Sequence, residues 1–513
     1  MLPYRQDSHT RLQADILTIK TEYKMKNKIL KMLAIGLALT SIVSCEDWKL
    51  LDEHPKKIDA TTFMSNADEV QSVINSIYSQ LERDAGFGRY LSILPEAMAD
   101  YAYGRGNYNT SYETGLTTNG QTFVKDSWAV LYRAIRFSNE IMSQIGDADL
   151  TRTEYKHLTG ETRYLRAFAY SFLVKYWGAV PFFDESNMDN FNKGRTPAET
   201  LWQYIVDEAD YAAQSLPESA AAGRPTKYSA LTLKGEALMY MEKWADAAEA
   251  FGEVISSGRY SLVTLSSADD FSKVYGIAAT GTPEEIFYIK FNRDVPAKFQ
   301  WMFLCKPNPV YATGAVGIYT DYKNNNFIAS WDKNDYRYQW SLWIQKDNGA
   351  LNAVTKTGMI CLKYRDYEDA TSCANDWPVY RYADVLLYCA EAICRRDGKP
   401  NAEAMEYVNM VRRRAYGMNP KKAQPVDRQL SNYSDKDSFM EMLLQERGYE
   451  TCFEAKRYCD LKRCGLLAEY AVKAGKISSA SEVKDAAWWW PIPTDEFNYN
   501  TAMDPAKDQN PGY

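Results

Sequence analysis

The sequence predicts a mainly α-helical protein: a scaffold of helical repeats that carries long irregular loop insertions and a few short strands. Three observations support this fold class. Apolar residues recur at helical spacing over long stretches towards both ends of the chain. Two pairs of these helices share one pattern of small and large residues, which is typical of repeat proteins. Between the two pairs the helical period is lost, and Asn, Gly, Tyr and Trp become frequent.

Four helices are predicted before the first pair. They cover residues 67–81, 124–145, 161–177 and 197–216. The third has an aromatic residue at every fourth position, which places these rings on one face of the helix. These residues are Tyr164, Phe168, Phe172 and Tyr176. Gly178 and Pro181 end that helix. Pro197 begins the fourth at the first-turn position that proline tolerates.

The two helix pairs span 228–241 with 244–255, and 382–396 with 402–416. Residues of the first pair fall at the spacing of a tetratricopeptide repeat (TPR): Gly235, Leu238, Trp244, Ala247 and Phe251. The equivalent positions of the second pair are Ala390, Ala404 and Val408. Small residues let paired helices approach, and large ones fill the groove between neighbouring pairs. TPR-like helices are therefore expected at about 161–257 and 381–416.

Two Tyr-rich irregular stretches interrupt this scaffold, at about 86–122 and 258–380. Long loops on a rigid scaffold usually carry function, and a high aromatic content is not typical of disordered segments. Within the second stretch, the apolar segment 286–291 predicts a short strand. We interpret both stretches as ligand-binding insertions.

The first 60 residues have the pattern of a targeting signal followed by a membrane anchor. Residues 1–24 fit no targeting pattern, and we interpret them as a misassigned extension upstream of a true start at Met25. Residues 25–44 have the form of a lipoprotein signal peptide, with a basic start and mostly apolar residues at 32–43. A helix over that apolar run would reach about 18 Å, too short for a bilayer core of about 30 Å.

Cys45 is the predicted lipidation site. It follows Ile42, Val43 and Ser44, an arrangement that resembles a bacterial lipobox, at which the cysteine is diacylated and becomes the mature N-terminus. Two or three acyl chains give a stable membrane anchor. Residues 45–60 would then form a lipidated tether, and residues 61–513 the folded domain. An ordinary signal peptide with an incidental cysteine is the alternative.

Composition and charge narrow the function. The net charge of −7 argues against a nucleic-acid partner, which needs a basic face. The chain has three histidines (His9, His54 and His157), which excludes a His-rich metal centre and argues against His-based catalysis. The sequence contains no phosphate-binding loop, zinc-protease or serine-hydrolase motif. We expect no cofactor, and no motif supports a bound Ca²⁺, which stays an open question.

Several blocks of the sequence resemble the SusD/RagB family of Bacteroidetes outer-membrane nutrient-binding lipoproteins. The blocks are Glu161–Tyr170 with Tyr176–Pro181, Val379–Leu387 with Ala390–Ala392, Glu446–Arg447 with Phe453–Leu461, Pro491–Pro493 and Gln509–Tyr513. The resemblance implies a mostly helical fold built on TPR-like units. It also implies that six Arg and Glu residues of these blocks tie helices together rather than touch a ligand: Arg163, Arg166, Arg381, Glu391, Glu446 and Arg457.

The same resemblance implies a function. Members of this family lie on the cell surface against a SusC-like TonB-dependent transporter and capture oligosaccharides for import, without being enzymes. We therefore expect a surface-exposed, lipid-anchored outer-membrane protein that binds an oligosaccharide or polysaccharide and delivers it to such a transporter.

Sugar sites need flat aromatic platforms for the C–H faces of pyranose rings, and polar groups for the hydroxyls. Burial of one ring face contributes about 1–2 kcal/mol. Residue type and location select nine candidate ligand contacts in the two insertions: Tyr101, Tyr103, Asn107, Tyr108, Trp301, Tyr311, Trp331, Tyr336 and Trp340. For each of them, packing of the insertion onto the scaffold is the alternative interpretation. Asp335 and Arg337 fit a scaffold role better than a ligand role.

Two other functions stay open at this stage. The first is a surface glycoside hydrolase. Such an enzyme needs only a pair of carboxylates, which leaves no sequence motif, and Asp332 with Asp335 would be its site. A structural TPR adaptor would bind the transporter and no sugar. The sequence does not identify the glycan, and a peptide or glycopeptide ligand is compatible with it.

Overall fold

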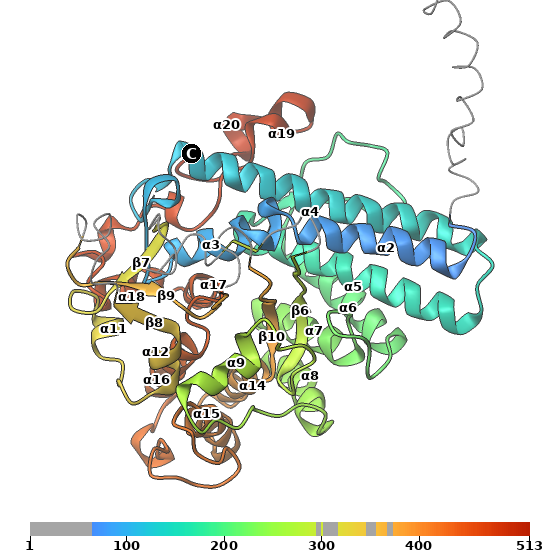
Figure 1. Ribbon diagram of the computed structural model, residues 1–513. Helices are drawn as coiled ribbons and strands as arrows, with labels where there is room; N and C mark the ends of the chain where they lie inside the picture. The colour runs from blue at the N-terminus through green and yellow to red at the C-terminus, as the bar shows by residue number, and fades with distance from the viewer. Residues whose placement is uncertain (1–63, 294–298, 301–315, 345–354, 367–372) are drawn as a thin grey trace, which may run out of the picture. The chain divides into compact units, whose positions relative to one another are not determined.

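The computed structural model describes residues 64–293, 299–300, 316–344, 355–366 and 373–513, and the fold is given for these residues (Figure 1). It is mainly helical with a few short strands, so the predicted fold class is confirmed. The predicted extension, signal peptide, Cys45 and tether lie outside the described residues. No helix in the described part of the chain combines the length and apolar character needed to cross a membrane.

Four long helices form the N-terminal half of the scaffold and follow one another as packed neighbours (Figure 1). They are α2 (Ala67–Leu81), α4 (Thr118–Gln144), α5 (Arg152–Trp177) and α6 (Ala198–Ser215). The helix predicted over 161–177 begins earlier because Thr151 and Glu154 form a capping box. It ends at Gly178, whose φ of 75° suits glycine.

The two predicted helix pairs are α7 (Lys227–Tyr240) with α8 (Trp244–Ser256), and α14 (Tyr382–Asp397) with α15 (Ala402–Ala415). Helix α8 packs against α14, so the pairs are neighbours in space although 125 positions separate them in the chain. A Cβ atom at Gly235 would lie 2.6 Å from the Phe251 ring. Close approach of the helices therefore requires the small residue that the repeat pattern predicts.

Nine further helices of the described residues complete the domain. They are α3 (Tyr90–Ala97), α9 (Ser272–Tyr275), α11 (Asn326–Ala329), α12 (Tyr336–Ser341), α16 (Lys436–Glu450), α17 (Arg457–Arg463), α18 (Leu467–Lys473), α19 (Thr494–Tyr499) and α20 (Pro505–Asp508). A π-helical turn covers Asp84–Gly88, and 3-10 turns cover Gly106–Tyr108, Ile145–Asp147, Ala268–Phe271, Leu430–Asn432, Ala480–Glu482 and Asp485–Ala487.

The strands connect the two insertions. A four-stranded antiparallel sheet has the order β1 (Tyr103–Gly104), β7 (Ile318–Asp321), β9 (Gly358–Cys361), β8 (Leu342–Ile344). The predicted strand 286–291 is confirmed as β6 (Glu285–Ile289), paired with β10 (Trp377–Arg381). Two further pairs are β2 (Thr110–Ser111) with β3 (Gly115–Leu116), and β4 (Val180–Pro181) with β5 (Arg195–Thr196).

A network of buried charges joins the C-terminal elements. The guanidinium of Arg381 is fully buried and donates to carboxylates at 2.8 Å (Glu450), 2.7 Å (Glu454) and 3.3 Å (Glu284). Arg414 contacts two of the same carboxylates, Glu284 and Glu450. These pairs tie α14, α15 and α16 to the segments that flank them, so charge replaces apolar packing in this part of the core.

The scaffold role that the family resemblance implies for six charged residues is confirmed by their partners. Arg163 and Arg166 both contact Glu208, Arg381 contacts the three carboxylates above, Glu391 contacts Arg463 and Arg395, Glu446 contacts Arg337 and Arg412, and Arg457 contacts Asp100. Each of these contacts joins separate elements or an element to a loop, except the i,i+4 pair Arg395–Glu391.

Candidate functional site

Strand pairing brings the two Tyr-rich insertions together at one face. Tyr103 of β1 lies opposite Tyr319 of β7, and their rings stack with centroids 5.3 Å apart. The amide N–H of Arg105 donates to the Gly317 carbonyl at 2.8 Å, which extends the pairing by one residue. We refer to Tyr103, Arg105, Asn107 and Tyr319 as the β1–β7 face.

A half-buried lysine, Lys476, fixes the loop next to this face. The ammonium of Lys476 donates to the carbonyls of Ala97, Ala99 and Ala102 at 3.3, 2.7 and 2.6 Å. It also lies 5.1 Å from the centre of the Tyr103 ring, within the range of a cation–π contact. Three hydrogen bonds from Lys476 therefore fix the loop that leads into β1, which positions the Tyr103 ring.

The rim of the face is polar. Asn107 is exposed in the turn after Arg105, and its side-chain oxygen accepts a hydrogen bond from the Asn119 amide at 2.7 Å. Tyr103 and Arg105 are half-buried, so each keeps part of its surface in contact with solvent. An aromatic ring beside a guanidinium and an amide supplies both the platform and the hydrogen-bonding groups that a polyhydroxylated ring requires.

Asp321, at the end of β7, organises the neighbouring turn. Burial opposes ionisation of its carboxylate, but hydrogen bonds from Thr357, Asn324, Thr355 and Lys323 outweigh this and hold its pKa at about 2. Because these donors already occupy both oxygens, the carboxylate shapes the loop rather than meeting a ligand.

Two of the predicted ligand contacts are wrong, because the structure places them in the core. Tyr101 is fully buried, donates to Glu96 and accepts the Phe453 N–H at 2.8 Å. Trp331 is 1% exposed, stacks on Tyr449 with centroids 4.4 Å apart, and its indole N–H donates to Asp335 at 3.0 Å. The alternative interpretation, packing of the insertion onto the scaffold, holds for both.

Other predicted contacts lie elsewhere or are mostly covered. Tyr108 is 8% exposed and packs on Phe123. Tyr336 is half-buried, and its hydroxyl donates to the Ser266 carbonyl at 3.3 Å. Trp340 is buried under the guanidinium of Arg365 and forms part of the wall of an open groove of about 940 Å³ along residues 261–283. Trp301 and Tyr311 lie outside the described residues.

Of the seven candidates within the described ranges, Tyr103 and Asn107 are therefore the two that lie together on one accessible face. Sequence reasoning missed Tyr319, which belongs to the β1–β7 face, and Lys476, which fixes the loop next to it. The alternating pattern of a short strand is only a weak signal for Tyr319. Nothing in the sequence around Lys476 distinguishes it from a surface lysine, because the carbonyls that it binds lie in a segment nearly 380 positions earlier.

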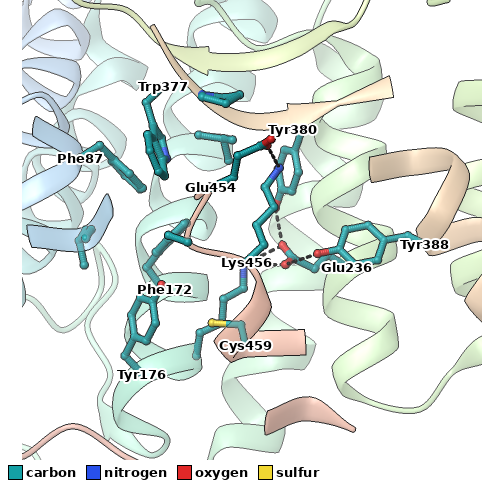
Figure 2. A pocket seen from close by; sticks show the side chains of 15 residues that line it. Phe87, Phe172, Tyr176, Glu236, Trp377, Tyr380, Tyr388, Glu454, Lys456 and Cys459 are labelled. Atoms are coloured by element: carbon teal, nitrogen blue, oxygen red, sulfur yellow. Dashed lines mark hydrogen bonds and ion pairs between the residues drawn. The ribbon is translucent and has the colours of Figure 1, made fainter. Parts of the chain in front are cut away.

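A small chamber in the charged core has a different character (Figure 2). Its volume is about 40 Å³, enough for a few water molecules. The carboxylate of Glu236 accepts from Lys175 at 2.8 Å and from the Tyr380 and Tyr388 hydroxyls (Figure 2). Since these groups are buried and satisfy one another, we interpret the chamber as structural.

Within the described ranges, no group of three or more His, Cys, Asp or Glu side chains could hold a metal ion. Cys389 and Cys394 of α14 are buried free cysteines, and burial raises the pKa of Cys389 to about 12.

Comparison with known proteins places this fold in a family. Two family models match: one described as "SusD family" over residues 311–513, and one described as "Starch-binding associating with outer membrane" over residues 49–234. The chain belongs to the SusD/RagB-like family. The resemblance that the sequence blocks carry is thereby confirmed.

Individual relatives agree with this assignment. SusD-like protein P25 of Formosa agariphila is 24% identical over 543 aligned positions, which cover 95% of this chain and all of the relative. A SusD homolog from Bacteroides thetaiotaomicron superposes with a TM-score of 0.73 at 24% identity over 89% of this chain and 99% of that one. Surface glycan-binding protein A from the same organism, in complex with laminarihexaose, superposes with a TM-score of 0.67 at 22% identity over 87% and 99%.

Proposed function

We propose that this SusD-like protein is a lipid-anchored, surface-exposed outer-membrane protein that binds an oligosaccharide, without catalysis, and delivers it to a SusC-like TonB-dependent transporter. The observation that carries the proposal is the β1–β7 pairing, which joins the two Tyr-rich insertions into one face with an aromatic platform and a polar rim. The fold is shared with a glycan-binding protein whose structure contains laminarihexaose.

The geometry around Asp332 and Asp335 favours binding over hydrolysis. Asp335 is buried, and its oxygens accept from the Arg337 guanidinium and the Trp331 indole. Asp332 accepts from Tyr416 at 2.9 Å and from the Asn334 amide. Burial and the Arg337 pair keep Asp335 from acting as an acid or nucleophile on a glycosidic bond, which a pair of accessible carboxylates would require.

Glycan binding is tested by affinity electrophoresis and calorimetry across a panel of polysaccharides and host glycans. We expect retardation by at least one glycan, with a dissociation constant between about 1 µM and 1 mM. The variant Tyr103→Ala should weaken it. Tyr155→Ala is the matched control, because Tyr155 is a 39%-exposed tyrosine on α5. Equal weakening in both variants would contradict the assignment of the site, and no binding to any glycan would favour the structural adaptor.

Catalysis and anchoring have separate tests. Prolonged incubation with the bound glycan should release no new reducing ends; release that Asp332→Asn abolishes would establish a hydrolase instead. For the anchor, Cys45→Ala should abolish metabolic labelling with a fatty-acid analogue and move the protein out of the membrane fraction. Co-purification of a TonB-dependent barrel with the wild-type protein tests the proposed partner.

A further inference from the structure

A second aromatic cavity, of about 430 Å³, opens between α4, the 182–192 segment and α19. None of its lining residues belongs to the β1–β7 face. Its aromatic lining comprises Trp128, Tyr132, Phe183, Phe191 and Tyr499. Phe191 and Tyr499 are 60% and 82% exposed, more than any other large apolar side chain of the described residues. One exposed ring needs no explanation, but two at the mouth of one cavity indicate a contact surface.

The walls of this cavity are held together before any ligand binds. Lys125 of α4 pairs with Asp495 of α19 at 2.6 Å. The Asn500 amide donates to the Lys193 carbonyl at 2.8 Å, and the Thr501 N–H donates to the Asn192 side chain at 2.9 Å. Each wall is therefore tied to another, which lowers the entropy cost of binding.

Polar groups with unused hydrogen-bonding capacity line the same cavity. Arg133 is exposed, and no ion pair or hydrogen bond of its guanidinium is recorded in the described part of the chain; burial and the nearby Arg83 lower its pKa. This guanidinium is therefore available to pair with an anion that a ligand brings. Asn139 is fully buried, its oxygen accepts from Arg166 at 2.8 Å, and its amide nitrogen has no partner among the described residues.

The remaining charges at the cavity are already engaged. Arg136 pairs with Glu140 at 2.7 Å, and its guanidinium carbon lies 5.7 Å from the centre of the Phe191 ring. Glu496 accepts from the Asn500 amide at 2.8 Å. Glu496 keeps its negative charge, because the amide that it accepts from is neutral, and Arg133 is the cation of this lining for which the described part of the chain shows no ion pair.

We propose that this cavity is a second ligand site and that it binds a pyranose ring bearing a carboxylate, that is, a uronic acid residue of a glycan. The exposed rings of Phe191 and Tyr499 supply surfaces for the C–H faces of the sugar, and Arg133 pairs with the carboxylate. The volume falls within the range of small-molecule sites. The proposal rests on the proposed function, because it extends glycan recognition from one face of the protein to a second.

The test compares two probes that differ only at C6, which is a carboxylate in methyl β-D-glucuronide and a hydroxymethyl group in methyl β-D-glucoside. Each probe is titrated against the protein and its binding is followed by ligand-observed NMR. We expect the glucuronide to bind about tenfold more tightly than the glucoside, because a charge-assisted pair stabilises it. Arg133→Gln should remove this preference, and Tyr499→Ala should weaken both probes. Tyr155→Ala should bind as the wild type does, and melting temperatures verify that each variant folds.

The outcomes separate this inference from the proposed function. Loss of glucuronide binding in Tyr103→Ala but not in Tyr499→Ala would overturn the second site and leave the β1–β7 face intact. Equal affinity for the two probes, unchanged by Arg133→Gln, would overturn the assignment to an acidic sugar. If neither probe binds while a polysaccharide still binds through Tyr103, the second site is refuted and glycan capture stands; binding of a transporter peptide there instead would also refute it.

Discussion

Around Arg381 every charged side chain is buried and has several partners, whereas at the β1–β7 face Tyr103, Arg105 and Asn107 keep part of their surface in solvent. Both regions use the same residue types. In the first, each guanidinium pairs with buried carboxylates, so substitution leaves an uncompensated buried charge. In the second, the polar groups have spare hydrogen-bonding capacity. In this protein, an arginine or tyrosine is therefore structural where it is buried and paired with other side chains, and available to a ligand where it keeps exposed surface and free hydrogen-bonding groups.

The largest effect is expected in the charged core. Arg381→Met should lower the free energy of unfolding by about 3–5 kcal/mol, because it leaves the buried carboxylates of Glu284, Glu450 and Glu454 without their shared cation. Urea unfolding measures this. The control is Arg396→Met, which removes a pair with Asp397 whose side chains are 40% and 31% exposed and should cost less than about 1 kcal/mol. Equal losses of unfolding free energy in the two variants would contradict the distinction between buried, multiply paired charges and exposed ones.

The second effect concerns Trp331, an aromatic residue of the second insertion that packs in the core. Trp331→Ala should lower the free energy of unfolding by about 3–4 kcal/mol, since it empties a buried site against Tyr449. At temperatures where the variant is folded, its glycan affinity should equal that of the wild type. A stable variant with weakened binding would instead return Trp331 to the ligand site.

A smaller effect is expected from pH. Burial disfavours the charged form of Glu391, but Arg463 and Arg395 outweigh it and lower the pKa of Glu391 to about 2. Because that value is below the unfolded one of about 4.3, the pair contributes stability above pH 4.3 that is lost as pH falls towards 2. The difference between wild type and Glu391→Gln should be about 2–3 kcal/mol at pH 7 and should shrink over that window. A constant difference across the window would contradict the ion pairing.

At the β1–β7 face we expect the smallest effect on the free energy of unfolding. The effect on glycan binding should be the largest there. Tyr103→Ala should weaken glycan binding about tenfold, the value of one sugar face on an aromatic platform. Its free energy of unfolding should fall by less than about 1 kcal/mol, because the ring is half-buried and Lys476 still holds the loop through three carbonyls. A loss of stability as large as that of Trp331→Ala would place Tyr103 in the core.

Local periodicity was sufficient for most of the scaffold. The helices at 67–81, 228–241, 244–255, 382–396 and 402–416 lie within a residue or so of their predicted bounds. The start of α5 was missed by nine positions, although the Thr151–Glu154 capping box that begins it is visible in the sequence. The residues of the candidate site were harder to predict from the sequence. Tyr101 and Tyr103 are two positions apart in one Tyr-rich loop, yet Tyr101 is buried in the core and Tyr103 is half-buried at the β1–β7 face.

By itself, the sequence determined the helical scaffold, the Gly235–Phe251 contact between paired helices and the family, since periodicity, small-residue spacing and short motifs are local properties. Only the tertiary structure decided which loop aromatics are accessible. The pairing of β1 with β7 across more than 200 positions creates the candidate face, and the packing of Trp331 on Tyr449 removes another candidate from solvent. Burial depends on which distant segments meet, and a residue's own neighbours in the chain do not encode that.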